Sequence, residues 1–313
     1  MLGCGGSSGL KLTTLEASVQ RPSNVAVYFT VDTADGEPVA GLQADSFRIY
    51  VDERLVSIHE SKQTILNPEV AAVHYTMLVV DMSGSVTECC EVPAVMDAAS
   101  SFADRIRNKQ QVGVFAFDGR KDLQRISGFD NNPDRLRSRI GKLDSFKTRD
   151  PSTNLNGAVV QALKVLDRQM RRASVPLRFG TLVVFTDGSD RAARVTREEL
   201  DQALEGSEHD IFVIGVGSEI DEAELSAIGR SGVVVRADRA EISAAFAEAA
   251  DRIDAFASRY YLLGYCSPAR AGVHTVRIEA VAEGKSGSLS YEFDAKGFRP
   301  RCDPEKKPRF NIR

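Results

Sequence analysis

The chain has 313 residues, of which 42% are hydrophobic and 27% are charged, a composition typical of a globular protein with one or two domains. Its net charge of -4, and the lack of a basic run with interleaved aromatic residues, argue against nucleic acid as a partner. No apolar run reaches the roughly 18 residues of a membrane-spanning helix. We therefore expect a soluble body that meets a membrane only through a lipid anchor.

The first residues resemble the start of a bacterial lipoprotein. In that family a Leu-x-Gly-Cys box ends the signal, the cysteine carries a diacylglyceryl anchor, and a flexible Gly/Ser tether follows. Here Leu2-Gly3-Cys4 lacks one residue of the box and precedes a Gly/Ser run over residues 5–9. We interpret residues 1–22 as a Gly/Ser-rich leader and tether with Cys4 as the lipid anchor. This interpretation predicts the bacterial outer membrane or cell envelope, periplasmic or surface-exposed. A cytoplasmic location is the alternative if the amino terminus is complete as given.

Residues 23–68 form a predicted β segment. Val25, Val27, Phe29 and Val31 alternate with other residues, as in a strand with one buried face, and residues 47–51 repeat the pattern after a turn. The period changes in residues 70–259, where short apolar runs alternate with helical patterns. That alternation predicts an α/β domain with a doubly wound, mostly parallel, Rossmann-like sheet flanked by helices.

The strands and helices of this domain can be placed along the chain. Strands are expected at residues 74–81, 112–117, 123–129, 182–186, 211–216 and 233–236, and helices at residues 86–108, 134–143, 155–171, 222–228 and 241–259. A further short helix should open at the capping box that begins with Thr196.

Strands return after Arg259, at residues 260–265, 273–281 and 288–293, within a second β segment over residues 260–298 that a polar tail, residues 299–313, follows. Because an isolated hairpin is marginally stable, the simplest arrangement joins both β segments into one small β-sandwich with the α/β domain inserted between them. Two separate β appendages remain an alternative.

Four of the cysteines allow more than one state. Cys266 and Cys302 could form a disulfide that closes a loop of about 36 residues, or could remain buried free thiols. Cys89 and Cys90 are adjacent, and the sequence does not decide between a disulfide and reduced thiols.

Five oxygen-bearing side chains point to a metal site. Asp81, Ser83 and Ser85 follow the first predicted parallel strand, Thr153 precedes a predicted helix, and Asp187 follows a buried strand. In open α/β sheets ligands bind beyond the carboxyl ends of the strands, where these loops should meet. Hard oxygen donors without thiol or imidazole favour Mg²⁺, with Mn²⁺ or Ca²⁺ as alternatives, over zinc or copper.

The pattern Asp-x-Ser-x-Ser, then a threonine before a helix, then an aspartate after a buried strand resembles the von Willebrand factor A family over roughly residues 73–258. The resemblance implies a metal-ion-dependent adhesion site in which Ser83, Ser85 and Thr153 are hydroxyl ligands and Asp81 and Asp187 act largely through water. It also implies that the last helix shifts when a ligand carboxylate enters. Residues 32–47 resemble the immunoglobulin-like piece ahead of some bacterial members.

Other groups of charged residues have simpler interpretations. Asp118 and Asp122 are expected at a solvated hairpin tip, and Arg135, Arg137 and Arg139 on a solvated helix face. The four histidines are scattered and indicate no zinc site. The serines and aspartates of the five-residue set could also serve only as turn and cap formers.

The resemblance implies a binding protein of the cell envelope, acting in adhesion or assembly, and not an enzyme. Neutral hydroxyl ligands leave the cation electrophilic, so a partner protein would present a Glu or Asp carboxylate to it. One alternative is an intracellular adaptor for an AAA-type ATPase or chelatase. Another is a metal-dependent hydrolase, for which no general base beyond the metal carboxylates is evident.

Overall fold

The computed structural model describes residues 9–88, 91–218 and 220–310, and the chain divides into two compact units. Unit 1 combines Met1–Ala72 with Ala255–Arg313, and unit 2 is Val73–Asp254. Cys4, Cys89 and Cys90 lie outside the described residues. Within the described parts, no helix is both long enough and apolar enough to cross a membrane.

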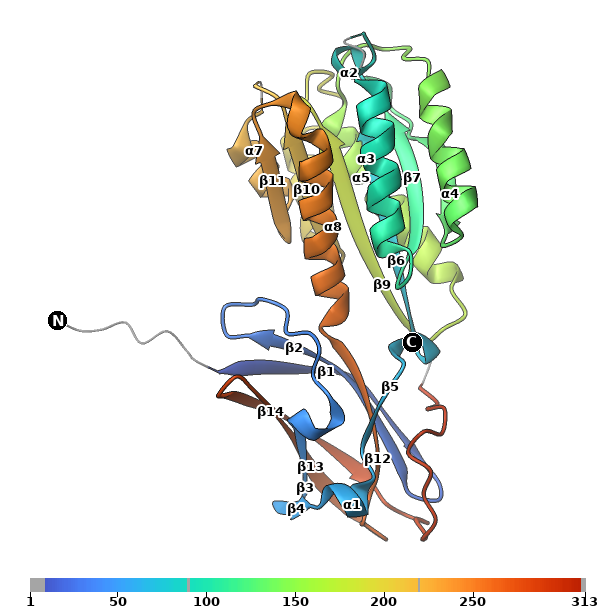
Figure 1. Ribbon diagram of the computed structural model, residues 1–313, viewed down its shortest axis with the longest axis vertical. Helices are drawn as coiled ribbons and strands as arrows, with labels where there is room; N and C mark the ends of the chain where they lie inside the picture. The colour runs from blue at the N-terminus through green and yellow to red at the C-terminus, as the bar shows by residue number, and fades with distance from the viewer. Residues whose placement is uncertain (1–8, 89–90, 219, 311–313) are drawn as a thin grey trace, which may run out of the picture. The chain divides into compact units, whose positions relative to one another are not determined.

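Unit 1 is built from two four-stranded sheets (Figure 1). The first has the order β1 (Leu10–Gln20), β2 (Asn24–Thr33), β12 (Tyr260–Cys266) and β5 (Thr64–Leu66). The second has the order β14 (Lys285–Asp294), β13 (Val273–Ala282), β3 (Phe47–Val51) and β4 (Arg54–Val56). β12 pairs antiparallel with β2, and β13 with β3, so both chain segments share each sheet. The α/β unit is therefore inserted into one β unit.

The two sheets of unit 1 enclose a single apolar core. Phe29 from β2 meets the ring of Phe47 from β3 edge-on at 5.5 Å and stacks on Tyr261 from β12 at 5.9 Å. Aromatic pairs in these geometries stabilise a core beyond the burial of their area. Residues more than 200 positions apart thus hold the unit together.

Strand β1 corrects the prediction that residues 1–22 are a leader and tether. Residues 10–20 pair with β2 along its length, from Leu10 with Thr33 to Gln20 with Asn24. Leu10, Leu12 and Ala17 pack against the core of the unit. The apolar residues of this stretch recur with the two-residue period of a strand, a signal that the Gly/Ser run before it obscured.

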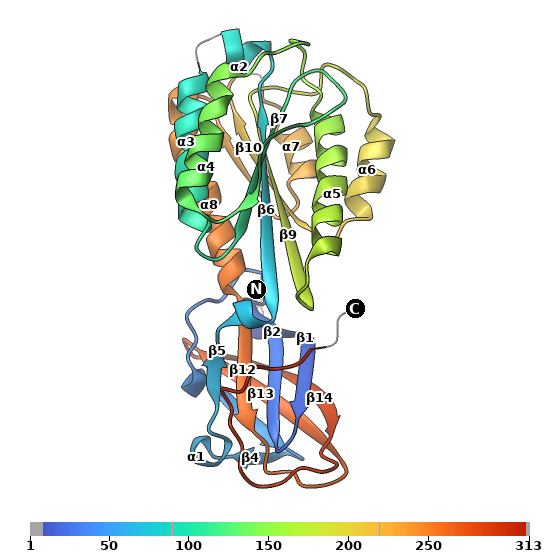
Figure 2. The same cartoon turned by 90° about the vertical axis from the view of Figure 1, so that its right-hand side faces the viewer.

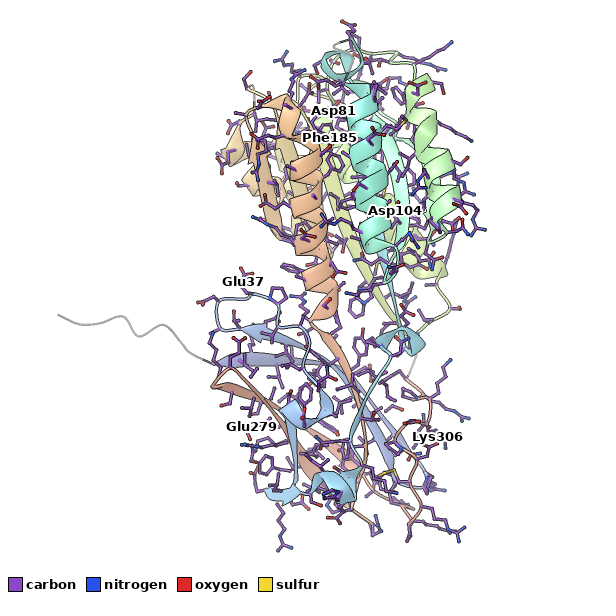
Figure 3. The ribbon with its side chains drawn as sticks, viewed as in Figure 1. Glu37, Asp81, Asp104, Phe185, Glu279 and Lys306 are labelled. Atoms are coloured by element: carbon purple, nitrogen blue, oxygen red, sulfur yellow. A yellow bond between two sulfur atoms is a disulfide. The ribbon has the colours of Figure 1, made fainter. Side chains whose placement is uncertain are left out.

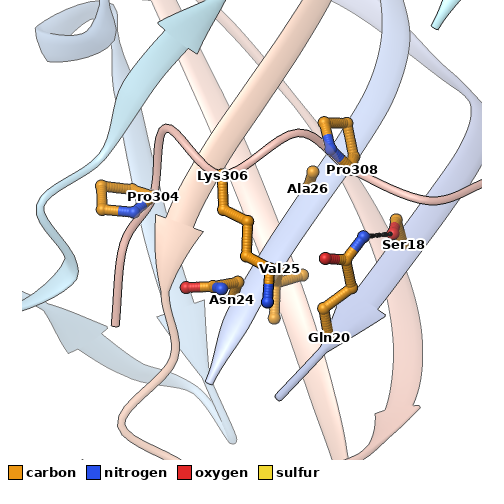
Figure 4. A pocket seen from close by; sticks show the side chains of 8 residues that line it. All are labelled: Ser18, Gln20, Asn24, Val25, Ala26, Pro304, Lys306 and Pro308. Carbon is orange, nitrogen blue, oxygen red and sulfur yellow. Dashed lines mark hydrogen bonds between the residues drawn. The ribbon is translucent and has the colours of Figure 1, made fainter. Parts of the chain in front are cut away.

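The segment expected as a polar tail is packed along the same sheet. The hydroxyl of Ser18 donates to the carbonyl oxygen of Arg309 at 2.8 Å, and the Lys306 ammonium donates to the carbonyl oxygen of Arg21 at 3.1 Å. Pro304 and Pro308 help to line a small cavity over β1 and β2, of about 10 Å³, room for one water molecule (Figure 4). Residues 299–310 therefore pack on unit 1, which the description of residues 299–313 as a polar tail did not predict.

Unit 2 contains a six-stranded sheet with the order β11-β10-β9-β6-β7-β8. Its strands are β6 (Ala72–Asp81), β7 (Gln111–Phe117), β8 (Gln124–Asp130), β9 (Leu177–Thr186), β10 (Asp210–Val216) and β11 (Gly232–Arg236). The pairs β6/β7, β9/β10 and β10/β11 are parallel, and the edge strand β8 is antiparallel to β7. Residues Tyr75 to Asp81 of β6 are all buried, as expected for a strand covered on both faces.

Helices cover both faces of this sheet (Figure 2). The helices are α2 (Gly84–Glu88), α3 (Val92–Ile106), α4 (Pro133–Ile140), α5 (Leu155–Arg172), α6 (Arg197–Glu205), α7 (Glu222–Ile228) and α8 (Ile242–Ser258). Met77 and Val79 share one core with buried side chains of α5, α6 and α7. On the other face, Phe246 of α8 contacts Phe102 of α3 at 6.2 Å and Phe185 of β9 at 5.1 Å. The predicted doubly wound α/β fold is confirmed.

The prediction of one long helix over residues 86–108 is wrong in one respect. Two helices replace it, with α2 ending at Glu88 and α3 beginning at Val92. Pro93 stands in the first turn of α3. Proline lacks a backbone N–H and is tolerated in a first turn but not in a helix interior, so it starts a new helix here.

Cys266 and Cys302 form a disulfide across 36 positions, with their Cα atoms 5.6 Å apart. It joins the end of β12 to the C-terminal segment. The disulfide adds a covalent tie to the hydrogen bonds that hold this segment on the sheet.

We expect the Cys266→Ser/Cys302→Ser variant to unfold at a lower temperature than the wild type. A closed loop of this length stabilises the folded state by up to about 4 kcal/mol through the entropy of the unfolded chain. Thermal unfolding monitored by circular dichroism, with and without a thiol reductant, checks this. Reductant should lower the wild-type midpoint to that of the variant, and equal midpoints for wild type and variant without reductant would contradict the role of the disulfide.

Candidate functional site

Asp81 is the last residue of the central strand β6 and is fully buried (Figure 3). Its Oδ1 accepts a hydrogen bond from the backbone N–H of Ser83 at 2.9 Å. Its Oδ2 accepts one from the hydroxyl of Thr186 at 2.7 Å, across from the neighbouring strand β9. The carboxylate is therefore fixed at the carboxyl edge of the sheet, where the sequence placed it.

The two serines connect Asp81 to Asp187. The hydroxyls of Ser83 and Ser85 are 3.2 Å apart, and the Ser85 hydroxyl donates to Oδ1 of Asp187 at 2.8 Å. Ser83 and Asp187 are buried, whereas Ser85 is exposed. Four of the five predicted residues thus form one hydrogen-bonded chain that opens to solvent at Ser85.

Thr153, the fifth predicted residue, lies in the loop before α5. Backbone hydrogen bonds join this loop to the loops that follow β6 and β9. The carbonyl oxygen of Pro151 accepts from the N–H of Gly84 at 3.0 Å, and that of Thr153 accepts from the N–H groups of Arg191 and Ala192, each at 2.9 Å. A Cβ at Gly84 would stand 2.9 Å from the Cβ of Pro151, so the close approach requires glycine. Within the described residues, the Thr153 hydroxyl makes no hydrogen bond to the other four.

Charge is poorly balanced at Asp81. Burial is the main cause that raises the pKa of its carboxyl to about 7, and the nearby carboxylate of Asp187 raises it further. Its hydrogen bonds come from a neutral amide and a neutral hydroxyl, and no cationic side chain of the described residues pairs with it. A bound cation would favour its ionised form.

Asp187, by contrast, has a cationic partner that no pattern in the sequence indicated. Arg239 donates to Oδ2 of Asp187 at 3.0 Å and to Oε1 of Glu91 at 2.6 Å. The Asp187 side chain is 1% exposed and that of Arg239 is 35% exposed. Arg239 stands 52 positions after Asp187 and just before α8, so only the fold brings the two together.

Asp118 does not lie at the solvated hairpin tip that the sequence predicted. It is 1% exposed, and its carboxylate accepts from Nε of Arg120 at 2.9 Å and from the backbone N–H of Arg149 at 3.1 Å. These bonds hold the pKa of Asp118 below its usual value despite its burial. The side-chain amide of Asn154 also donates to the carbonyl oxygen of Arg120 at 2.7 Å. Asp118 therefore helps to fix the loop of Thr153.

The donors fit a hard divalent cation. Three hydroxyls and two carboxylates on loops at one sheet edge supply only oxygen, the ligand type that Mg²⁺, Mn²⁺ and Ca²⁺ prefer. The described residues contain no group of three or more His, Cys, Asp or Glu side chains that could hold a metal. Any cation here would depend on the hydroxyls of Ser83, Ser85 and Thr153 as much as on the carboxylates.

Residues 76–189 match the family described as von Willebrand factor type A domain. The chain contains a von Willebrand factor A domain. The match begins inside β6 and ends just after Asp187, so it spans all three loops of the candidate site in the A domain. A comparison with curated proteins finds no match.

Solved structures of several proteins are similar to this chain. A von Willebrand factor type A protein from Catenulispora acidiphila is 11% identical, over 93% of this chain and 75% of that one, with a TM-score of 0.47. Manganese-loaded TRAP protein of Plasmodium vivax is 15% identical, over 77% of this chain and 98% of that one, with a TM-score of 0.48. The vWF domain of the type V pili tip protein Mfa5 from Porphyromonas gingivalis is 12% identical, over 60% of this chain and 97% of that one, with a TM-score of 0.46.

The structure also adds polar residues to the predicted set. Thr186 immediately precedes Asp187 and holds Asp81, so its place at the end of a buried strand was a usable signal. Arg239 had no such signal, because its partners lie in other loops, and neither had the contact of Asp118 with the N–H of Arg149. The remaining predicted charged group, Arg135, Arg137 and Arg139, lies on α4, where these side chains pair with Asp104 and Asp130.

Proposed function

We propose that the A domain is a divalent-cation-dependent protein-binding module and acts in adhesion or assembly. Mg²⁺ is the proposed cation, with Mn²⁺ or Ca²⁺ as alternatives, and Asp81, Ser83, Ser85, Thr153 and Asp187 are its proposed ligands. The observation that carries the proposal is the buried carboxylate of Asp81, which lacks a cationic partner among the described residues and lies at the end of a chain of hydroxyls. A buried charge is costly unless a cation or hydrogen bonds compensate it.

The proposed partner is a protein that presents a Glu or Asp side chain. Neutral hydroxyl ligands donate little charge, so a divalent ion held by them keeps a strong attraction for another anion. The exposure of Ser85 supports entry from solvent at that end of the site. A partner carboxylate would complete the coordination of the ion and make binding depend on it.

The proposed location is the bacterial cell envelope, with Cys4 as a lipid anchor and the domain periplasmic or surface-exposed. The disulfide between Cys266 and Cys302 supports an oxidising compartment, because disulfides are rare in cytosolic proteins. The same observation disfavours the alternative of an intracellular adaptor for an AAA-type ATPase or chelatase.

A catalytic role is the weaker alternative. A hydrolase that activates water on the ion would need a general base, and the two carboxylates at the site are the proposed metal ligands themselves. We therefore propose that the protein is not an enzyme. Metal-dependent turnover of a phosphatase or peptidase substrate that Asp81→Ala abolishes would overturn this.

The decisive measurement is isothermal titration of chelator-treated protein with Mg²⁺ and Mn²⁺. We expect one ion per chain for the wild type and no binding for Asp187→Ala, because the variant loses the carboxylate that holds Ser85. Asp201→Ala is the matched control, since it removes an aspartate on α6 that is 46% exposed and pairs with Arg197. Equal affinities for the two variants would place any bound ion elsewhere.

Replacing Arg239 should strengthen metal binding. Its guanidinium competes with the ion for the charge of Asp187, so we expect Arg239→Gln to raise the affinity for Mg²⁺ by about tenfold. The same variant should unfold at a lower temperature without metal, because it leaves the Glu91 and Asp187 carboxylates unpaired.

Arg252→Gln is the control for this experiment. It removes another ion-paired arginine, from α8, that lies outside the site. Titration and thermal unfolding of both variants separate an effect of local charge from one of net charge. Weaker metal binding by Arg239→Gln would show that the arginine supports the site instead of competing with the ion.

Mass spectrometry of the native protein checks the anchor. We expect a diacylglyceryl-modified Cys4 at the start of the mature chain and membrane association that Cys4→Ser abolishes. Ser7→Ala, a substitution close to Cys4 in the same Gly/Ser run, serves as the control. An unmodified Cys4 in a cytosolic fraction would contradict the envelope location and leave the metal proposal untouched.

A further inference from the structure

A second candidate site lies in unit 1, beside the disulfide. It is a cavity of about 190 Å³ at the end of β12. Its walls come from the β1–β2 turn, from α1 (Ile58–Ser61) and the residue after it, from the segment after β12 and from the C-terminal segment. The argument for a ligand uses the basic side chains Lys62, Arg270 and Arg301, the acidic Glu60, and Ser23.

The cavity carries an excess of positive charge. Lys62, Arg270 and Arg301 line it, and Glu60 is the one acidic residue among its lining residues. All three basic residues are exposed, and none forms an ion pair with a carboxylate of the described residues. Surface cations of this protein are commonly paired, as those on α4 and α8 are. Three unpaired cations around one hollow are therefore available to an anion.

The hydroxyl of Ser23 adds a hydrogen-bonding group to the wall of the cavity. Ser23 is 2% exposed, and its hydroxyl has no hydrogen-bond partner within the described residues. A hydroxyl at a cavity wall that makes no bond within the protein can donate to or accept from a ligand there. Its backbone is fixed, since the Ser23 carbonyl oxygen accepts from the N–H of Ser267 at 3.0 Å.

The cationic groups are held on constrained backbone. Nη1 of Arg270 donates to the carbonyl oxygens of Ser267 at 3.0 Å and Ala269 at 2.9 Å, which orients the guanidinium and leaves its other N–H groups for a ligand. Arg301 has a φ of 76°, in the left-handed region that favours glycine, and adjoins the disulfide at Cys302. A non-glycine residue keeps such a conformation only where its surroundings fix it.

We propose that this cavity binds the phosphate group of a small phosphate ester. Three cations against one carboxylate leave two positive charges, which match a phosphate dianion better than a single carboxylate. Guanidinium N–H groups and the Ser23 hydroxyl are donors suited to its oxygens. Since the cavity exceeds the volume of one phosphate ion, it has room for an attached polyol. The source is either a soluble ester or a lipid headgroup, and the site is independent of the proposed metal site.

Isothermal titration of the whole protein with glycerol 3-phosphate tests the proposal. A metal chelator in the buffer prevents binding through a cation at the A domain. We expect saturable binding that weakens with salt, and no heat from glycerol. The Lys62→Gln/Arg301→Gln variant should bind at least about tenfold more weakly, because two charge-assisted contacts are lost. Ser23→Ala should weaken binding by a smaller factor.

The matched control is Lys285→Gln/Lys296→Gln, which removes two exposed cations from unit 1 away from the cavity. Circular dichroism confirms that each variant is folded. Co-sedimentation with vesicles that contain phosphatidic acid, whose headgroup is a phosphate monoester, against vesicles of phosphatidylcholine alone, identifies the source. Binding to the vesicles and not to the soluble ester, lost in the cavity variant, would assign the phosphate to a lipid. Absence of binding to both, or equal binding by the cavity and control variants, would overturn the proposal.

Discussion

The burial of Asp81 at the end of β6 is the constraint on which the loops of the candidate site depend. A carboxylate with no access to water must accept hydrogen bonds, and it takes them from Ser83 and Thr186. Those two bonds fix the start of the loop before α2 against the end of β9. The Asp81 carboxylate thus organises the site. Among the described residues, no cationic side chain pairs with it.

The same set of loops shows two ways of compensating negative charge. Asp118 pairs with Arg120, and Asp187 pairs with Arg239, while Asp81 has only neutral donors. A divalent ion held by the hydroxyls would act on Asp81 and Asp187 together and would compete with Arg239. Arg239 begins the 3-10 turn Arg239–Glu241 that leads into α8, so competition between Arg239 and a bound ion acts next to the helix that the family resemblance implies can move.

The β unit has a different organising principle, the joining of distant chain segments. Strands β2 and β12 are neighbours although more than 200 residues separate them, and the disulfide and the packed C-terminal segment close the unit beyond β12. This closure also creates the basic cavity, because Lys62, Arg270 and Arg301 come from three segments that meet only in the folded unit. The β unit therefore has a basic cavity that is lined by its own residues alone.

The sequence by itself determined the α/β fold and the place of Asp81, Ser83, Ser85 and Asp187. A buried strand and the loop after it are local, and parallel strands bring their carboxyl ends to one edge. It did not predict β1, where a Gly/Ser run masked a two-residue period, or the packing of the polar tail against β1 and β2. Only the tertiary structure decided the partner of Arg239, the contact of Asp118 with Arg149, the sharing of both sheets in unit 1 and the basic cavity. Each of these depends on side chains from distant segments, and no local pattern specifies which of them will meet.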